Sequence, residues 1–144
     1  MIRQKKRAKY INKRVIVRTR AEAAAAFGPQ VEGYNIPQAL DAIFDQGAGG
    51  TIIVNNVFDP DIHATPAAVT TAQIIGAIDA NGIATGLSGA YECYNRFGYF
   101  PKFLLSAQSS VPGVRVEMDA VARKLNAMAI CDLPASRIDK TASG

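Results

Sequence analysis

The chain has 144 residues, of which 49% are hydrophobic and 19% charged. This balance is typical of a globular protein with a buried core and excludes an intrinsically disordered chain. No stretch approaches the roughly 18 consecutive apolar residues of a membrane-spanning helix, and the basic N-terminus lacks the apolar segment of a secretory signal peptide. The length fits one domain, and two widely separated cysteines, Cys93 and Cys131, predict reduced thiols in the core.

The net charge of +4 is concentrated at the N-terminus. Residues 1–20 contain nine lysine and arginine residues and no acid, whereas residues 21–144 hold the other seven basic residues and all twelve acids. Clustered basic residues can bind nucleic-acid phosphates. Tyr10 is, however, the one aromatic residue available there for base stacking, and no helix-turn-helix or zinc-ligand spacing follows. We therefore expect residues 1–14 to be a flexible basic lead, solvated or docked on an acidic protein surface, and not a nucleic-acid-binding segment.

The first part of the core is expected to form a strand, two helices and a second strand. The β-branched run at residues 15–17 predicts the first strand, and the alanine-rich run at residues 21–26 predicts a helix that Gly28 ends. The next helix is expected to start at Asn35, which forms a capping-box pattern with Gln38. The apolar face of this helix consists of Ile36, Ala39, Leu40, Ile43 and Phe44, and its outward face carries Asp41 and Asp45.

A glycine turn at residues 47–50 leads into a predicted strand over residues 51–57. Residues 52–54 of this strand are all apolar and show no alternation, which suits a strand covered on both faces. Residues 58–83 are expected to be irregular. Within them, residues 70–78 fit either a helical turn or one arm of a hairpin folded at residues 79–82. The sequence leaves these two alternatives open.

The last part of the core is expected to form a helix, a strand, a long helix and a final strand. An apolar stripe at helical spacing from residue 85 predicts a helix that Gly98 ends, and residues 102–107 predict a strand. Ser110 is placed to cap the long helix, with Pro112 in its first turn, and residues 128–133 predict the last strand. The long helix has an apolar stripe of Val114, Met118, Val121, Ala122 and Leu125.

Together these elements predict an α/β fold. It contains a sheet of about four mostly parallel strands, helices on both faces of the sheet, and an irregular or hairpin insertion near residues 58–83. We expect one core domain over residues 15–135, preceded by the lead and followed by a flexible tail over residues 136–144.

Polar residues follow several of the predicted strands, at the position where open α/β sheets bind ligands. They are Asn55, Asn56 and Asp59 after one strand, Ser106, Gln108, Ser109 and Ser110 after another, and Asp132 after the last. A small enzyme or nucleotide-binding domain that uses these strand ends is therefore the alternative interpretation.

The residue patterns required for that chemistry are missing from the sequence. The single histidine, His63, lies in the irregular segment, and residues 85–89 have threonine in place of the first glycine of a nucleophile elbow. The glycine turn at residues 47–50 precedes a strand, whereas a phosphate loop precedes a helix. The alternation of Asp59, Asp61 and His63 lacks a further metal ligand. We therefore expect no catalytic, cofactor-binding or metal site, and a protein that is not an enzyme.

Six sequence blocks follow one another along the chain: AFG at residues 26–28, IPQALDAIFDQGAGGTIIVNNVFDP at residues 36–60, IIGAID at residues 74–79, TGLSGAY at residues 85–91, FGYFPKFLLSAQSS at residues 97–110 and VARKLNAMAICDLP at residues 121–134. In this order they resemble the central part of the contractile tail sheath proteins of Mu- and P2-like bacteriophages and prophages. The resemblance covers about residues 15–135. Relative to the family, the chain corresponds to a core without the N- and C-terminal arms that link neighbouring subunits.

The resemblance implies a structural subunit that polymerises around a tail tube and contracts to drive the tube through the host envelope. It implies other sheath subunits, the tail tube protein and the baseplate as partners, and a place in the virion tail after assembly in the host bacterial cytoplasm. We hypothesise that oppositely charged residues belong to separate contact surfaces between subunits, because complementary potentials guide register. The candidate contact residues are Asp41, Asp45, Lys13, Arg14, Arg18 and Arg20.

Overall fold

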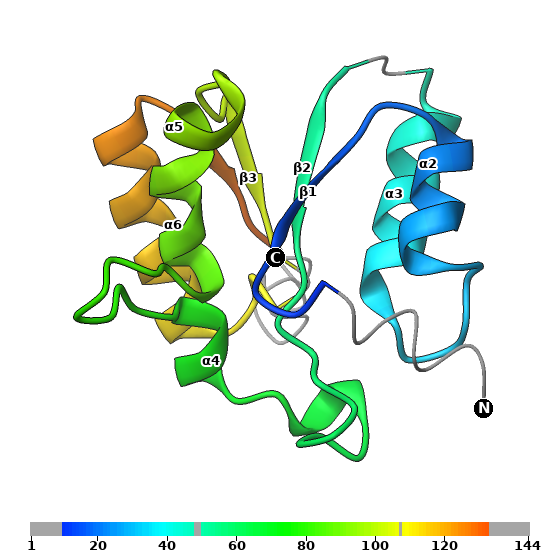
Figure 1. The fold of residues 1–144 in the computed structure, drawn as a ribbon, viewed down its shortest axis with the longest axis horizontal. Helices are drawn as coiled ribbons and strands as arrows, with labels where there is room; N and C mark the ends of the chain where they lie inside the picture. Colours follow the sequence, from blue (N-terminus) through cyan, green and yellow to red (C-terminus); the bar gives the residue numbers. More distant parts are fainter. Residues whose placement is uncertain (1–9, 48–49, 107, 133–144) are drawn as a thin grey trace, which may run out of the picture. The chain divides into compact units, whose positions relative to one another are not determined.

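The structure, a computed structural model, describes residues 10–47, 50–106 and 108–132, which form both helices and strands (Figure 1). The prediction of a mixed α/β fold is confirmed. The chain divides into two compact units, residues 1–89 and residues 90–144. Residues 1–9 of the predicted lead and the predicted tail at residues 136–144 lie outside the described residues. The single core domain over residues 15–135 stays a prediction.

The first unit is built on a two-stranded antiparallel sheet. β1 (Arg14–Val17) pairs with β2 (Ile52–Asn55), with Val17 opposite Ile52. Between the two strands the chain forms α2 (Arg20–Phe27) and α3 (Asn35–Asp45), which pack against each other (Figure 1). Because each helix reverses the direction of the chain, two successive helices return it so that β2 runs opposite to β1.

The core of the first unit lies between these helices and the sheet. Its buried side chains are Val17, Ala23, Ala26, Phe27, Leu40 and Val54. Tyr10 packs beside this core, with its ring centroid 6.0 Å from that of Phe27. Residues 10–14 are therefore part of the folded unit, and a flexible lead would be shorter than the sequence predicts.

Thr19 and Gly28 set the ends of α2. The Thr19 hydroxyl accepts a hydrogen bond from the backbone N–H of Glu22 at 3.2 Å, which satisfies one of the unpaired amides of the first turn. Gly28 ends the helix with a φ of 77°, a conformation that favours glycine. The helix predicted over residues 21–26 is confirmed and is slightly longer than expected.

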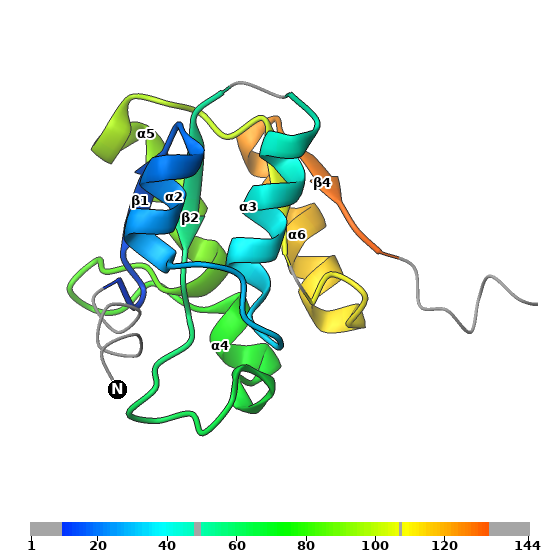
Figure 2. The same ribbon diagram turned by 90° about the vertical axis from the view of Figure 1, so that its right-hand side faces the viewer.

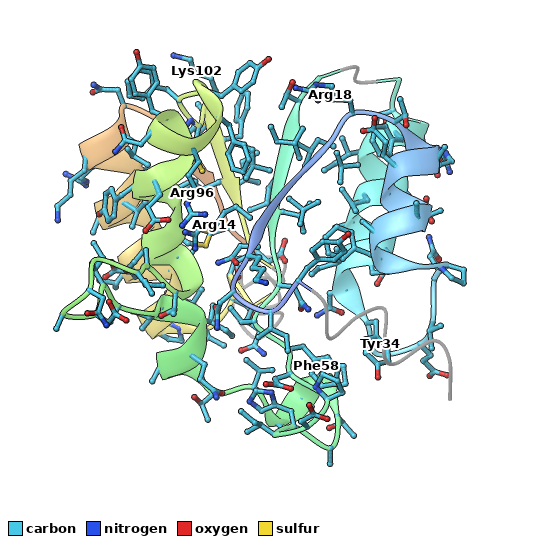
Figure 3. All side chains as sticks on the ribbon, viewed as in Figure 1. Arg14, Arg18, Tyr34, Phe58, Arg96 and Lys102 are labelled. Carbon is cyan, nitrogen blue, oxygen red and sulfur yellow. The ribbon has the colours of Figure 1, made fainter. Side chains whose placement is uncertain are left out.

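The helix predicted from Asn35 is also confirmed, but its start differs. Asn35 is the first helical residue and Tyr34 is the N-cap, so the predicted capping box of Asn35 with Gln38 is wrong. Tyr34 packs edge-on against Phe58 at a centroid distance of 5.4 Å (Figure 3). This aromatic contact holds the start of α3 on the segment that follows β2.

β2 ends at Asn55, two residues before the end that the sequence predicts. The Asn56 side chain accepts a hydrogen bond from the backbone N–H of Phe58 at 3.1 Å and donates one to its carbonyl oxygen at 3.2 Å. Such a local side-chain turn competes with strand pairing. The asparagine that follows the apolar run therefore ends the strand.

The segment over residues 58–83 is irregular, as predicted, and residues 71–75 adopt the helical alternative, while a single isolated bridge forms in place of a hairpin arm. After η1 (Pro66–Ala68), the short helix α4 (Thr71–Ile75) starts with a reciprocal capping box between Thr70 and Gln73. The chain then folds back at residues 79–82, and Ile78 forms an antiparallel bridge with Ala84.

The second unit contains a two-stranded parallel sheet. β3 (Phe103–Leu105) and β4 (Met128–Ile130) are joined by α6 (Pro112–Leu125), which contacts both strands (Figure 2). One intervening helix makes consecutive strands parallel, as predicted. The side chains that α6 buries are Val114, Met118, Val121 and Ala122. They belong to the predicted stripe, although the N-cap is Val111 and not Ser110.

The apolar stripe from residue 85 does not form one α-helix as predicted. It forms the 3-10 helix η2 (Gly86–Glu92) and then α5 (Cys93–Phe97), which Gly98 ends in the left-handed conformation. Gly86 has a φ of 53°, which lies outside the α-helical region. Cys93 is buried and Cys131 is partly exposed, and both are thiols.

Within the described residues the strands pair into two two-stranded sheets, one antiparallel and one parallel. The predicted single sheet of about four mostly parallel strands is therefore not confirmed. The prediction that β1 and β2 are parallel was wrong, because it treated the two helices between them as one crossover.

Candidate functional site

His63 organises the irregular segment of the first unit. It is 6% exposed, and its Nδ1 accepts a hydrogen bond from the backbone N–H of Asp59 at 3.1 Å. Its Nε2 must then carry the proton, and it lies 3.0 Å from Oε1 of Gln73, which accepts it. The ring stacks on Phe58 at a centroid distance of 5.9 Å. Both ring nitrogens are therefore occupied by contacts that hold the loop.

The aspartates near His63 also have local structural roles. Oδ1 of Asp59 accepts a hydrogen bond from the backbone N–H of Asp61 at 2.9 Å, which is a turn-forming contact. Among the described residues, no group of three or more His, Cys, Asp or Glu side chains is placed to hold a metal ion. The arrangement fits a packed loop.

The polar strand ends of the first unit bind backbone groups of the same unit. The Asn55 side-chain amide donates a hydrogen bond to the carbonyl oxygen of Gly86 at 2.7 Å, and Asn56 forms the turn with Phe58 that ends β2. These two side chains hold the segments that follow β2.

In the second unit the structure brings together two of the predicted strand-end residues, Ser109 and Asp132. Ser109 is 2% exposed, and its Oγ accepts a hydrogen bond from the backbone N–H of Asp132 at 3.0 Å. The same hydroxyl lies 3.4 Å from Oδ2 of Asp132, to which it can donate. A buried serine engaged in this way joins the ends of β3 and β4 and is poorly placed to act as a nucleophile.

Arg14 is the residue whose position differs most from the expectation for a surface contact. It is 9% exposed, and its Nη1 donates hydrogen bonds to the carbonyl oxygens of Ala84 at 2.6 Å and Asn12 at 3.2 Å. A Cβ added to Gly89 would lie 3.1 Å from Cδ of Arg14. Arg14 thus attaches β1 to residues 84–89. The sequence alone does not distinguish this buried arginine from the exposed basic residues near it.

The other charged residues on α2 and α3 form an ion-pair cluster. Nη1 of Arg20 lies 3.3 Å from Oδ1 of Asp41, and Nη2 of Arg20 lies 2.5 Å from Oδ1 of Asp45. Gln30 donates a further hydrogen bond to Oδ2 of Asp41 at 2.7 Å. The hydrogen bond and the charge of Asp45 raise the pKa of Arg20, with a smaller contribution from Asp41.

The candidate contact residues therefore occupy three different situations. Arg20 neutralises part of the acidic face within its own chain, and Arg14 is buried. Lys13 and Arg18 are exposed. Figure 3 shows Arg14 at the start of β1 and Arg18 just past its end. The cluster of Arg20, Asp41 and Asp45 keeps one net negative charge. Lys13 and Arg18 are exposed cations next to the two ends of β1.

The second unit has an apolar sheet face, formed by Phe103, Leu105, Met128 and Ile130, that the sequence did not indicate. These side chains are 60%, 59%, 60% and 47% exposed. Phe103 is paired with Met128 and Leu105 with Ile130, so all four project from one face of the sheet. Leu104, between them in sequence, is buried on the face that α6 covers. The sequence of β3 is apolar at every position, so it gave no alternation that would mark an exposed face, and we expected helices on both faces of the sheet.

No family model matches the chain. Two curated proteins are similar to it. The tail sheath protein of Burkholderia phage BcepMu is 30% identical over 187 residues, a match that takes in 77% of this chain and 39% of the relative. A prophage major tail sheath protein of Pseudomonas aeruginosa (strain UCBPP-PA14) is 35% identical over 123 residues, which are 85% of this chain and 30% of the relative.

The chain spans well under half the length of either relative. The match to the BcepMu protein extends over 187 residues although it takes in 77% of a chain of 144. That relative therefore carries additional sequence within the matched region. Both matches include most of this chain, and both proteins are named for the tail sheath. The resemblance inferred from the sequence blocks is thus confirmed. The chain corresponds to part of the length of these relatives and belongs to the phage tail sheath proteins.

Proposed function

We propose that this chain is a structural component of a contractile phage tail sheath and supplies part of the α/β core of the subunit. The relationship to two sheath proteins over most of the chain carries this proposal. In this role the chain assembles with other sheath subunits around a tail tube and on a baseplate, in the cytoplasm of the host. In the virion tail, contraction of the sheath then drives the tube through the host envelope.

The side-chain chemistry favours this mechanical role over the alternative of a small enzyme or nucleotide-binding domain. His63 uses both ring nitrogens to hold a loop, and Ser109 is engaged by Asp132. A general base or nucleophile needs a side chain that is free to meet a substrate. We propose that the chain is not an enzyme and that residues 15–135 act together as one core domain of the subunit. None of the helices in the described residues has the length and hydropathy of a membrane span.

The proposal is tested by replacing the matched region of the Pseudomonas aeruginosa relative with this chain. We expect the chimera to form tubular sheaths that are visible by negative-stain electron microscopy. As an independent check, a thermal-shift screen of this chain with nucleotides and divalent metals should leave its melting temperature unchanged, since specific ligands stabilise a protein by mass action. A chimera that folds and never assembles, together with a nucleotide-dependent rise in melting temperature, would favour the enzyme alternative.

The α2–α3 surface is the proposed place of one contact between subunits. Asp41 and Asp45 share the single cation of Arg20, so this surface keeps a net negative charge that can meet a basic segment of a neighbouring subunit. Reversing both aspartates to lysine in the chimera should slow or abolish sheath assembly. The matched control is Asp119→Lys, which reverses an exposed acid on α6 that is paired within its own helix. Equal assembly by the double variant and the control would exclude this contact.

A further inference from the structure

Within the described residues of the second unit, no helix or strand covers the apolar sheet face. Phe103, Leu105, Met128 and Ile130 are each about half exposed or more, and the opposite face is packed against α6. Parallel sheets are almost always covered on both faces, because their strands bury apolar side chains on either side. A parallel sheet with one bare apolar face therefore indicates a missing layer.

The terminal segments of this chain that lie outside the described residues do not have the composition to form that layer. Residues 133–144 contain Leu133 and Ile138 as their large apolar side chains among charged and small residues. Residues 1–9 carry a run of lysine and arginine. A covering segment needs several apolar side chains on one face, so these segments are poor candidates.

A second copy of this chain is also a poor match by area. Judged by its free energy of transfer from water, full burial of a Leu, Ile, Met or Phe side chain corresponds to roughly 60–120 Å² of apolar surface, so four that are about half exposed offer on the order of 200 Å². A stable interface between two proteins buries about 800 Å² on each partner. The area suits one helix or strand that is held in place by its connection to the rest of a longer polypeptide.

The relatives contain such additional polypeptide. The match to this chain accounts for 39% of one and 30% of the other, and the BcepMu protein also carries extra sequence within the matched region. We infer that the face formed by Phe103, Leu105, Met128 and Ile130 is the docking site for an amphipathic segment of the sheath polypeptide that this chain does not contain. The segment lays its apolar stripe across β3 and β4 and completes the second unit as a three-layer structure. This inference rests on the proposed function.

The test measures the reactivity of cysteines placed on and off this face. Leu105→Cys reports on the face. The matched control is Val116→Cys, which lies on α6 of the same unit and replaces a side chain that is 68% exposed. Each substitution is made in this chain alone and in the chimera with the Pseudomonas aeruginosa relative. Monomeric fractions are pulsed with N-ethylmaleimide, and peptide mass spectrometry reads each site separately from Cys93 and Cys131.

We expect both introduced cysteines to react at similar rates in this chain alone. In the monomeric chimera the rate at position 105 should fall by about tenfold or more, because a covered thiol reacts only when its contact opens, while the rate at position 116 stays the same. An unchanged rate at position 105 in the folded chimera would overturn the inference. So would protection of position 105 in this chain alone. Protection that grows with concentration would identify a second copy as the partner, and protection that is independent of concentration would identify another segment of this chain.

Two further arrangements keep the result interpretable. If the chimera does not fold, this chain is co-expressed with the two flanking parts of the relative as separate polypeptides and is labelled in the same way. The inference is then contradicted if the cysteine at position 105 reacts as fast as it does in the chain alone. Sheath formation is scored on separate samples. Protection in a monomer that never forms sheaths would therefore support the docking site and contradict the proposed function.

Discussion

Gly76 makes a close backbone contact in the first unit, and replacing it with alanine tests how the irregular segment is packed. It ends α4 with a φ of 70° and a ψ of −170°, a combination that is almost restricted to glycine. A Cβ added at this position would lie 2.0 Å from the carbonyl oxygen of Thr85 and 2.8 Å from Cα of Gly86. Because these are backbone atoms, the overlap is relieved only if one chain segment moves.

Two costs add in Gly76→Ala. The backbone conformation costs about 1–3 kcal/mol for a residue with a Cβ, and forcing an extra carbon into packed structure costs about 1–3 kcal/mol more. We therefore expect the free energy of unfolding to fall by about 2–6 kcal/mol. This is a large part of the roughly 5–15 kcal/mol by which a typical domain is stable.

Gly82 offers the matched control in the same unit. Its φ is 78°, but a Cβ added to it would meet nothing within 4 Å. Gly82→Ala should therefore cost only the conformational term of about 1–2 kcal/mol. Urea unfolding followed by circular dichroism measures both variants against the original chain, with similar slopes required for comparison. Equal losses in the two variants would refute the close approach of residue 76 to residues 85 and 86.

Three other predictions concern packing, the histidine and charge. Met118 is 0% exposed, and Met118→Ala should lower the free energy of unfolding by about 2–5 kcal/mol. Val116→Ala is the control at an exposed position of the same helix, and it should change the free energy of unfolding by no more than about 0.5 kcal/mol. His63→Ala should cost about 1–3 kcal/mol, because it leaves buried hydrogen-bonding groups without their partner; a melting temperature of the original chain that rises with added zinc would contradict the structural role. Arg20→Gln should lower the melting temperature slightly at low ionic strength, and the difference should vanish in concentrated NaCl, since exposed ion pairs are screened. The raised pKa of Arg20 contributes stability that is fully present below the pKa of Arg20 in the unfolded chain and is lost only as the pH rises through its pKa in the folded protein. The difference in melting temperature between Arg20→Gln and the original chain should therefore be constant across neutral pH.

The amino-acid sequence by itself determined the local elements and the family. The apolar stripe that becomes the buried side of α6 is visible at helical spacing, and so is the stripe of α3, of which Leu40 is buried. Gly28 and Gly98 end the helices where glycine was expected to end them. The ordered blocks carried the relationship to sheath proteins. These features depend on residues that are close together in the chain, and local spacing is sufficient to read them.

Only the tertiary structure decided how distant segments meet. Arg20 pairs with an aspartate 25 residues away, and Arg14 bonds to a carbonyl oxygen 70 residues away. The direction of β2 and the bare face of β3 and β4 likewise depend on where the chain returns after a helix and on which surfaces another segment covers. Periodicity reports which side of an element is apolar, but it carries no information on which partner, in this chain or beyond it, buries that side.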